Sequence, residues 1–168
     1  MWKSWHRALR HLASTGWLAR RRFPAAELAR LQQGIAASER EHAGQLRFVV
    51  ESALDWRDAW RGMSARARAL EWFGLLRVWD TEENTGVLVY VLLAERRIEI
   101  VADRGIDRRV PSRAWEEICA EVGRAMAEGK RVAGLEAGLW RIHALLIEHA
   151  PRRGGPGVNE LPDEVIVR

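Results

Sequence analysis

An unbroken apolar run that is rich in valine, from Gly86 to Leu93, constrains the fold of this chain more than any other segment. A run of this length without polar alternation is typical of a strand that is covered on both faces. A charged break at 95–97 follows, and a second apolar run extends from Ile98 to Ala102. Two such runs around a short polar break predict a β-hairpin. The hairpin would bring the loop before it, 80–85, next to the loop after it, 103–107.

Periodicity and end signals predict the other strands and helices. We expect a helix that starts at Phe23 and Pro24 and stops at Gly44, followed by a strand at 45–52 and a tryptophan-bearing connection at 55–63. Ser64 should cap the next helix, which has Leu70 on its apolar face. After the hairpin we expect a helix capped by Ser112 that ends at Gly129, a last helix that stops at Pro151, and an edge strand at 165–167. A helix between two parallel strands crosses over right-handed, so strand 45–52 should run parallel to 86–93. Helices then cover both faces of a small mixed sheet with a central hairpin, which is an α/β fold of three layers.

The positive charge of the chain is concentrated in its first 22 residues. Six basic residues and no acidic residue give this segment a charge of +6, whereas the whole chain has a net charge of +4. The rest of the chain is therefore near neutral, which argues against a nucleic-acid-binding surface across it. We expect a basic arm at 1–22, one domain at 23–150, and a flexible linker with a short tail at 151–168.

Large apolar residues recur at helical spacing in the arm, at Trp2, Trp5, Leu9 and Leu12, with basic residues between them. This composition is typical of a helix that lies in the interface of an anionic lipid surface. A helix that packs its tryptophans onto its own domain or onto a protein partner explains the spacing equally well. An unstructured basic tail fits the charges but not the spacing.

The sequence predicts a cytoplasmic protein that is peripheral on the cytoplasmic face of the inner membrane. No apolar run approaches the roughly 20 residues that span a bilayer. No apolar segment of the signal-peptide type follows the first basic residues. The single Cys119 excludes an internal disulfide and falls on the apolar stripe of a predicted helix, where we expect a buried structural thiol.

Several catalytic motifs are absent from the sequence. There is no GxxxxGK[ST] loop, no GxGxxG after a strand, no HExxH, no CxxC and no GxSxG. Ser52 and Ser64 have no histidine nearby in the sequence, so neither is nominated as a nucleophile. The catalytic residues, if the chain has any, therefore stay unassigned at this level.

Acidic and amide side chains gather in the two loops that the hairpin brings together. Calcium and magnesium prefer such clustered oxygens. We expect Asp103 and Asp80 to be metal ligands, with Thr81, Asn84, Thr85, Asp107 and Glu39 as further candidates at this edge. Ordinary loop and cap roles, with pairing to neighbouring arginines, are the alternative explanation. A weaker candidate set lies at the opposite, carboxyl end of the strands: Asp55, Trp56, Asp58 and Arg96.

The order of these segments resembles the TPM domain family. The resemblance runs from Phe23 to Asp163 and is carried by Ser38-Glu39 with His42 and Gly44, by ALEWFGLLRVWDTEENTGVLVYV, by IEIVADRGI, by the helix with Trp115 and by NELPD. It implies a Rossmann-like α/β/α sandwich of the compact bacterial branch that lacks a transmembrane tail. Members have been linked to acid phosphatase activity and to calcium binding, although most have no established activity. Thr81 and Asp103 match the family pattern, whereas Thr85 replaces its usual Asn and Ala102 replaces a frequent Gly.

Three functions compete at this point. The leading one is a non-catalytic interaction module at the membrane that holds Ca²⁺ or Mg²⁺. The second, implied by the resemblance alone, is a metal-assisted acid phosphatase; attack by water is then favoured over a covalent route, although Asp103 could act as a nucleophile. The third is nucleic-acid binding through the arm, for which the sequence offers no recognised fold.

Overall fold

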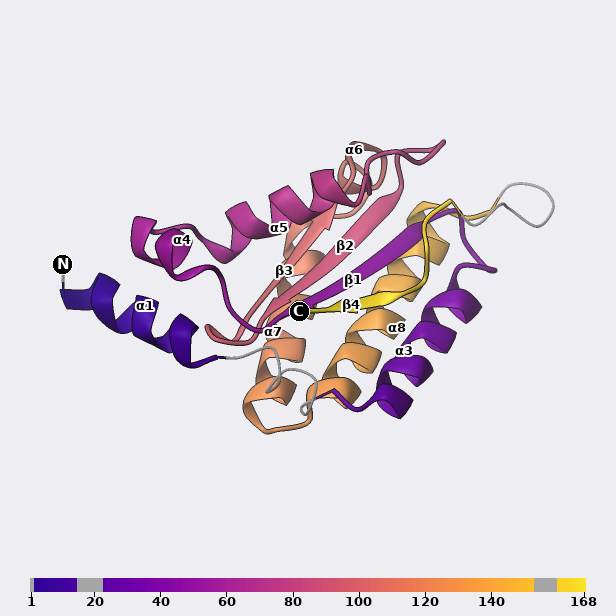
Figure 1. Ribbon diagram of the computed structural model, residues 1–168. Helices are drawn as coiled ribbons and strands as arrows, with labels where there is room; N and C mark the ends of the chain where they lie inside the picture. The colour runs from indigo at the N-terminus through magenta and orange to yellow at the C-terminus, as the bar shows by residue number, and fades with distance from the viewer. Residues whose placement is uncertain (1, 15–22, 153–159) are drawn as a thin grey trace.

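The computed structural model describes residues 2–14, 23–152 and 160–168. Residues 1 and 15–22 of the predicted arm and residues 153–159 of the predicted linker and tail lie outside them. The elements in chain order are α1 (Trp2–Ala13), α3 (Ala25–Ser38), β1 (Gln45–Glu51), α4 (Trp56–Arg61), α5 (Ala65–Leu75), β2 (Gly86–Leu92), β3 (Arg97–Ala102), α6 (Arg104–Asp107), α7 (Ser112–Ala127), α8 (Arg131–His149) and β4 (Val165–Val167) (Figure 1).

A four-stranded sheet with the order β3-β2-β1-β4 forms the centre of the described part of the chain. β1 pairs in parallel with β2, from Gln45 opposite Gly86 to Glu51 opposite Leu92. β4 is the edge strand on the other side of β1 and is also parallel to it. β2 and β3 form the predicted antiparallel hairpin, which places β3 at the opposite edge. The mixed sheet and the predicted directions of β1, β2 and β3 are therefore confirmed.

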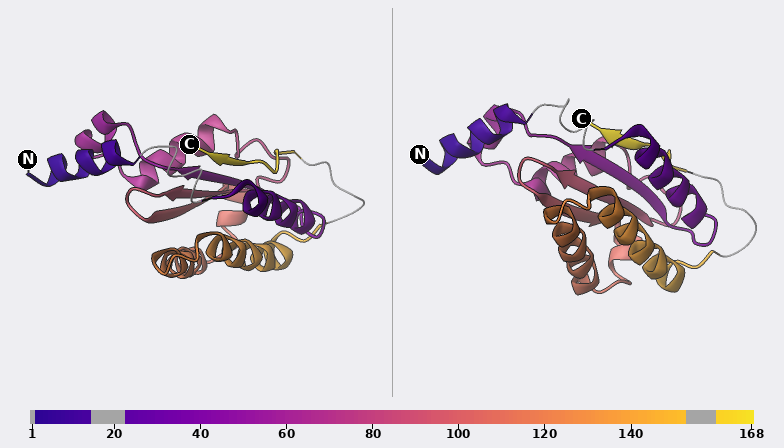
Figure 2. Two further views of the ribbon diagram at one scale, coloured as in Figure 1. Left: turned by 60° about the horizontal axis from the view of Figure 1, so that its bottom comes forward. Right: turned by 90° about the horizontal axis from the view of Figure 1, so that it is seen from below.

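Helices cover both faces of this sheet, as predicted. Every residue of β1 and of β2 is buried, which explains the continuous apolar composition of β2. In β1 the burial extends to three polar residues, Gln45, Arg47 and Glu51. On one face, alternate residues of the strands, such as Phe48 and Val89, pack with α3, α7 and α8. On the other face, residues such as Val49 and Leu88 pack with α5. Figure 2 shows α7 and α8 beneath the sheet and α4 and α5 above it.

Two glycines of α8 let α7 approach closely. A Cβ at Gly134 would lie 2.7 Å from the Cβ of Ala125, and one at Gly138 would lie 2.6 Å from Cγ2 of Val122. α7 therefore makes the close helix approach that the two glycines, four residues apart, allow. Cys119 lies on the α7 side of this contact, half-buried against the core, and burial raises the pKa of its thiol to about 11.

The structure corrects four local predictions. The connection at 55–63 contains α4, because Asp55 caps it by accepting the N–H of Arg57 and Gly62 ends it with a left-handed φ of 85°. α3 ends at Ser38, well before Gly44. Ser112 is the first residue of α7 and its side chain makes no cap hydrogen bond. Leu70 is half exposed on α5 and does not belong to the core face.

The two ends of the described chain reach different parts of the molecule. α1 lies beside α4 at one end, and Ala8 is buried between them (Figures 1 and 2). The C-terminal segment passes over the other end of β1, where the side-chain oxygen of Gln45 accepts the N–H groups of Glu160 and Leu161. None of the described helices is both long and apolar enough to cross a bilayer.

Gly86, at the start of β2, should be intolerant of any side chain. Its Cβ would lie 1.9 Å from the carbonyl oxygen of Val78. We predict that Gly86→Ala lowers the free energy of unfolding by more than about 2 kcal/mol, since the backbone of the loop that precedes β2 must shift. Gly74→Ala is the matched control, because a Cβ there meets nothing within 4 Å. Urea unfolding of both variants measures the difference; equal stabilities would contradict the close approach.

Candidate functional site

The two loops before and after the hairpin lie against each other at the amino edge of the sheet, which we define as the end where β1 and β2 begin. The N–H of Asp103 donates to the carbonyl of Gly86 (2.8 Å), and the N–H of Gly105 donates to the carbonyl of Asn84 (3.0 Å). A Cβ at Gly105 would lie 2.5 Å from the carbonyl oxygens of Asn84 and Glu83. Glycine is therefore required for this contact, and the predicted juxtaposition of the loops is confirmed.

The threonines of the first loop hold its shape. The hydroxyl of Thr81 accepts the N–H of Thr85 (3.0 Å), and the hydroxyl of Thr85 donates to the carbonyl of Ala43 (2.9 Å). Both side chains are buried. Asn84 adopts a left-handed φ of 55°, a conformation that asparagine tolerates better than most residues. The Thr85 hydroxyl thus performs a structural task, because it links this loop to the segment before β1.

Asp103 has the most distinctive environment at this edge. It is 7% exposed, and its Oδ1 accepts the N–H of Arg104 (2.7 Å) at the start of α6. Its Oδ2 is buried and has no hydrogen-bond partner among the described protein atoms. A buried carboxylate oxygen without a partner carries a desolvation cost, and native proteins satisfy such atoms with water or an ion in most cases.

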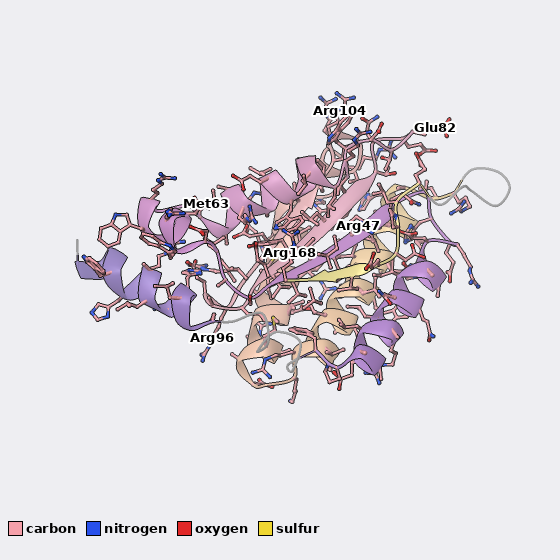
Figure 3. The ribbon with its side chains drawn as sticks, in the orientation of Figure 1. Arg47, Met63, Glu82, Arg96, Arg104 and Arg168 are labelled. Carbon is pink, nitrogen blue, oxygen red and sulfur yellow. The ribbon has the colours of Figure 1, made fainter. Side chains whose placement is uncertain are left out.

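The other predicted ligands are more open to solvent. Asp80 and Asp107 are both exposed. The amide oxygen of Asn84 accepts from Nε of Arg104 (2.9 Å), and Figure 3 shows Arg104 and Glu82 projecting at this end of the molecule. Across the described ranges, no three His, Cys, Asp or Glu side chains converge on one point suited to a metal ion. A metal ligand role for Asp103 and Asp80 therefore stays a prediction.

Glu39 lies at the same edge beside the start of β1, with β2 between it and Asp103. Its Oε1 accepts the N–H of Leu46 (2.7 Å), and its Oε2 is buried. Burial, together with the neighbouring carboxyl of Asp163, raises the pKa of Glu39 to about 8, although the bond from Leu46 opposes this shift. Glu39 is thus protonated at neutral pH and is not a charged metal ligand in this state.

Two arginines and a histidine surround Glu39. The guanidinium of Arg152 donates to the carbonyls of Glu39 and His42, and that of Arg47 donates to the carbonyl of Pro162. Burial lowers the pKa of His42 to about 4, and the nearby His143 adds to the effect. The imidazole of His42 is therefore neutral at pH 7, with its Nδ1 donating to the carbonyl of Gly44 (3.1 Å). These groups tie the C-terminal segment to the start of β1.

The carboxyl end of the parallel strands holds the weaker candidate set, and the structure gives its acids structural roles. Asp55 caps α4, and Asp58 lies 3.9 Å from Arg61 on the same helix. Arg96 has a left-handed φ of 52° in the hairpin turn. Met63 and Arg96 lie toward the end of the molecule opposite Arg104 (Figure 3). α1 covers part of this end beside α4. The sequence offered packing of this helix onto its own domain as one alternative, but it did not indicate where the contact would lie.

Sequence reasoning missed one buried charge. Glu51 on β1 accepts hydrogen bonds from Arg68, from Nε1 of Trp72 (3.1 Å) and from the hydroxyl of Tyr90 (2.7 Å). Burial by itself would raise the pKa of Glu51, but these donors outweigh it and the pKa is lowered. The only signal of this buried charge in the sequence was the position of Glu51 at the end of a predicted strand.

The family can be assigned once this geometry is in place. The TPM domain model matches residues 21–145, which is most of the chain. This chain belongs to the TPM domain family. No curated protein sequence matches it. The resemblance that its motifs indicated is thereby confirmed.

Two solved structures have the same fold as this TPM domain. One is the NMR structure of the BA42 protein from the psychrophilic bacterium Bizionia argentinensis, with 22% identity, a TM-score of 0.75, and coverage of 86% of this chain and 94% of that chain. The other is the solution NMR structure of the N-terminal domain of a protein from P. gingivalis, with 18% identity, a TM-score of 0.62, and coverage of 78% and 82%. At these identities the likeness establishes the fold alone.

The protonation of Glu39 makes a testable contribution to stability. A folded pKa of about 8, above the ordinary value of 4.5, means that the folded state retains a proton which the unfolded state releases. Stability is therefore lost as the pH rises from about 4.5 to 8. We predict that Glu39→Gln, which mimics the protonated form, removes this loss and is more stable than the parent at pH 8.5, by on the order of 3 kcal/mol.

The measurement is urea unfolding from pH 5 to pH 9 for the parent, Glu39→Gln and Glu41→Gln. Glu41 is the matched control because its side chain is 63% exposed two residues away. A Glu39→Gln profile that runs parallel to the parent profile would show that Glu39 is ionised in the folded protein.

Proposed function

We propose that this TPM domain is a non-catalytic binding module that holds a calcium ion at the amino edge and works on the cytoplasmic face of the inner membrane. The observation that carries the calcium part is the buried, unpartnered Oδ2 of Asp103 between two adjacent loops. Calcium accepts carboxylate, amide and backbone carbonyl oxygens in flexible geometry, whereas magnesium demands a stricter octahedron. The donors at this edge therefore suit calcium better than magnesium.

The loops offer a small set of oxygens of low total charge. Asp103 supplies the carboxylate, Asn84 and Thr81 supply neutral oxygens, and the exposed carboxylates of Asp80 and Asp107 are the further candidates. Arg104 would have to release the amide oxygen of Asn84, with which it now bonds. Calcium affinity falls as the number of charged ligands decreases, so we expect a dissociation constant of about 10⁻⁴ to 10⁻³ M.

The placement of the candidate serine nucleophiles and of His42 gives little support to covalent catalysis. Ser64 caps α5 by accepting the N–H of Ala67, and the N–H of Ser52 donates to the carbonyl of Arg168 at the opposite end of the sheet. His42 is neutral and deeply buried, which leaves it poorly placed to activate a nucleophile. These placements favour a binding role for the amino edge.

The membrane part of the proposal rests on α1. Trp5, Leu9 and Leu12 of this helix are all more than half exposed, and the helix carries basic residues but no acid. Apolar side chains beside a basic surface favour contact with anionic lipid. Nucleic-acid binding has weaker support, because the excess of positive charge is confined to the arm while the rest of the chain is near neutral.

Asp103→Asn tests the calcium site. Asparagine can cap α6 as well as aspartate does, so the fold should be preserved. Loss of the ligand charge should weaken calcium binding by roughly tenfold or more. Isothermal titration of calcium into the parent and the variant measures the change, with circular dichroism as the folding control.

Asp58→Asn is the matched control, because Asp58 lies on α4 at the opposite end of the sheet, away from the proposed calcium ligands. It should retain calcium affinity within a few-fold of the parent. Absence of calcium binding in the parent, or equal affinity in Asp103→Asn, would leave Asp103 as a capping residue only.

A metal-assisted acid phosphatase is the competing function, since the same Asp103 oxygen could position a metal-bound water for attack on a phosphate ester. Phosphate release from an aryl phosphate, with calcium or magnesium and with excess chelator, separates the two. We predict little or no turnover, and any turnover should vanish with chelator. Robust activity in excess chelator would contradict both the binding module and the metal-assisted mechanism.

A further inference from the structure

α1 and α4 enclose an apolar groove at the carboxyl end of the strands. Its volume is about 440 Å³. The residues that line it are Trp5, Ala8, Leu9, Leu12, Trp56 and Trp60. The rings of Trp5 and Trp60 meet edge to face, with centroids 4.8 Å apart, so the two helices form one continuous surface. We call this surface the tryptophan groove.

A polar clamp fixes α1 in this orientation. The guanidinium of Arg7 bonds to the carboxylate of Glu95 (2.6 Å) in the hairpin turn and to the carbonyls of Ala59 and Met63 at the end of α4. His11 is buried; its Nδ1 accepts the N–H of Leu54 (3.0 Å), so its Nε2 carries the proton and donates to Glu95 (2.9 Å). The clamp therefore uses the polar side of α1 to hold the helix on the domain.

The consequence is that the apolar side of α1 is left partly open. The five large side chains of the tryptophan groove are between 36% and 59% exposed. If packing onto the domain were their only role, Leu9 and Leu12 would turn inward to remove that area from water. A contiguous apolar surface of this kind marks a site of interaction.

Basic residues border the tryptophan groove. Arg10 is exposed on α1, the side chain of Arg61 is 74% exposed on α4, and the guanidinium of Arg57 lies 5.2 Å from the centre of the Trp56 ring. α1 and α4 together contain five basic residues, and Asp58 is the one acid among them. The positive border is complementary to a negatively charged surface.

We propose that the tryptophan groove is a composite lipid-binding surface, in which α1 and α4 enter the interface of an anionic phospholipid bilayer together. Tryptophan prefers this zone because its ring is apolar while its N–H reaches water or headgroups. A helix from a protein partner would also fill an apolar groove, but three tryptophans within a basic border match the lipid interface more fully. The inference rests on the membrane part of the proposed function and is independent of calcium.

The test is flotation of the full chain with vesicles of phosphatidylcholine alone or with about 30% phosphatidylglycerol, whose anionic headgroups attract basic residues near the surface. The informative variant is Trp56→Ser/Trp60→Ser, which leaves the arm unchanged. We expect the parent to bind the anionic vesicles, to bind less as salt is raised, and to lose about tenfold or more of its partition coefficient in this variant.

Trp140→Ser is the matched control, because Trp140 is 49% exposed on α8 on the other side of the sheet. It should bind vesicles as the parent does. Circular dichroism and thermal unfolding check that each variant is folded, and Trp56→Ser alone gives a second comparison in case the double variant is unstable.

The outcomes separate the inference from the function on which it rests. If the parent binds anionic vesicles and Trp56→Ser/Trp60→Ser binds them equally well, the composite surface is overturned, while a membrane role for the arm is kept. Failure of the parent to bind anionic vesicles would overturn both. A dimer detected by light scattering, lost in Trp56→Ser/Trp60→Ser and without vesicle binding, would assign the groove to a second copy of the chain and overturn the lipid proposal. The calcium titration is unaffected by any of these results.

Discussion

The parallel pairing of β1 with β2 is the constraint on which the other features depend. Because Gln45 lies opposite Gly86 and Glu51 lies opposite Leu92, every loop is assigned to one of two ends of the sheet. The antiparallel return of β3 then delivers Asp103 to the amino edge, next to the loop that precedes β2. The hairpin turn with Glu95 is delivered to the opposite end, where it receives Arg7 and His11 of α1. Two separate surfaces thus follow from one strand pairing.

Two glutamates of similar burial show how neighbouring groups decide protonation in this protein. Glu39 and Glu51 are each 5% exposed. Glu51 receives a guanidinium, an indole N–H and a phenol O–H, so it remains charged and joins β1 to α5 and β2. Glu39 receives one backbone N–H and faces the carboxyl of Asp163, so it keeps its proton. Burial alone therefore does not predict charge, and the number of donors does.

The sequence predicted those features that depend on local pattern. The apolar runs identified β1, β2 and β3, and the hairpin brought Asp103 beside the loop of Thr81 and Asn84 without any further information. The sequence could not predict α4, because six residues are too few for a periodic signal. It also could not predict the hydrogen bond between Asn84 and Arg104, because that bond depends on the direction of the two side chains. The contact of Glu39 with Asp163 joins distant parts of the chain, so no local pattern encodes it. The same limit hid the fact that α4 completes the apolar surface of α1.

The separation of the two surfaces has a consequence for orientation. β2 has seven residues, and at about 3.3 Å per residue a strand of that length spans roughly 20 Å. α1 and α4 lie at one end of that span, and α6 with the loop of Asn84 lies near the other (Figure 1). A chain that rests on lipid through the tryptophan groove would hold its amino edge roughly 20 Å farther from the membrane than the groove. This separation is well beyond the Debye length of about 8 Å at physiological salt. Asp103 would then encounter the ion concentration of the bulk solution, not the altered concentration at an anionic surface, so calcium occupancy and lipid binding would respond to different signals.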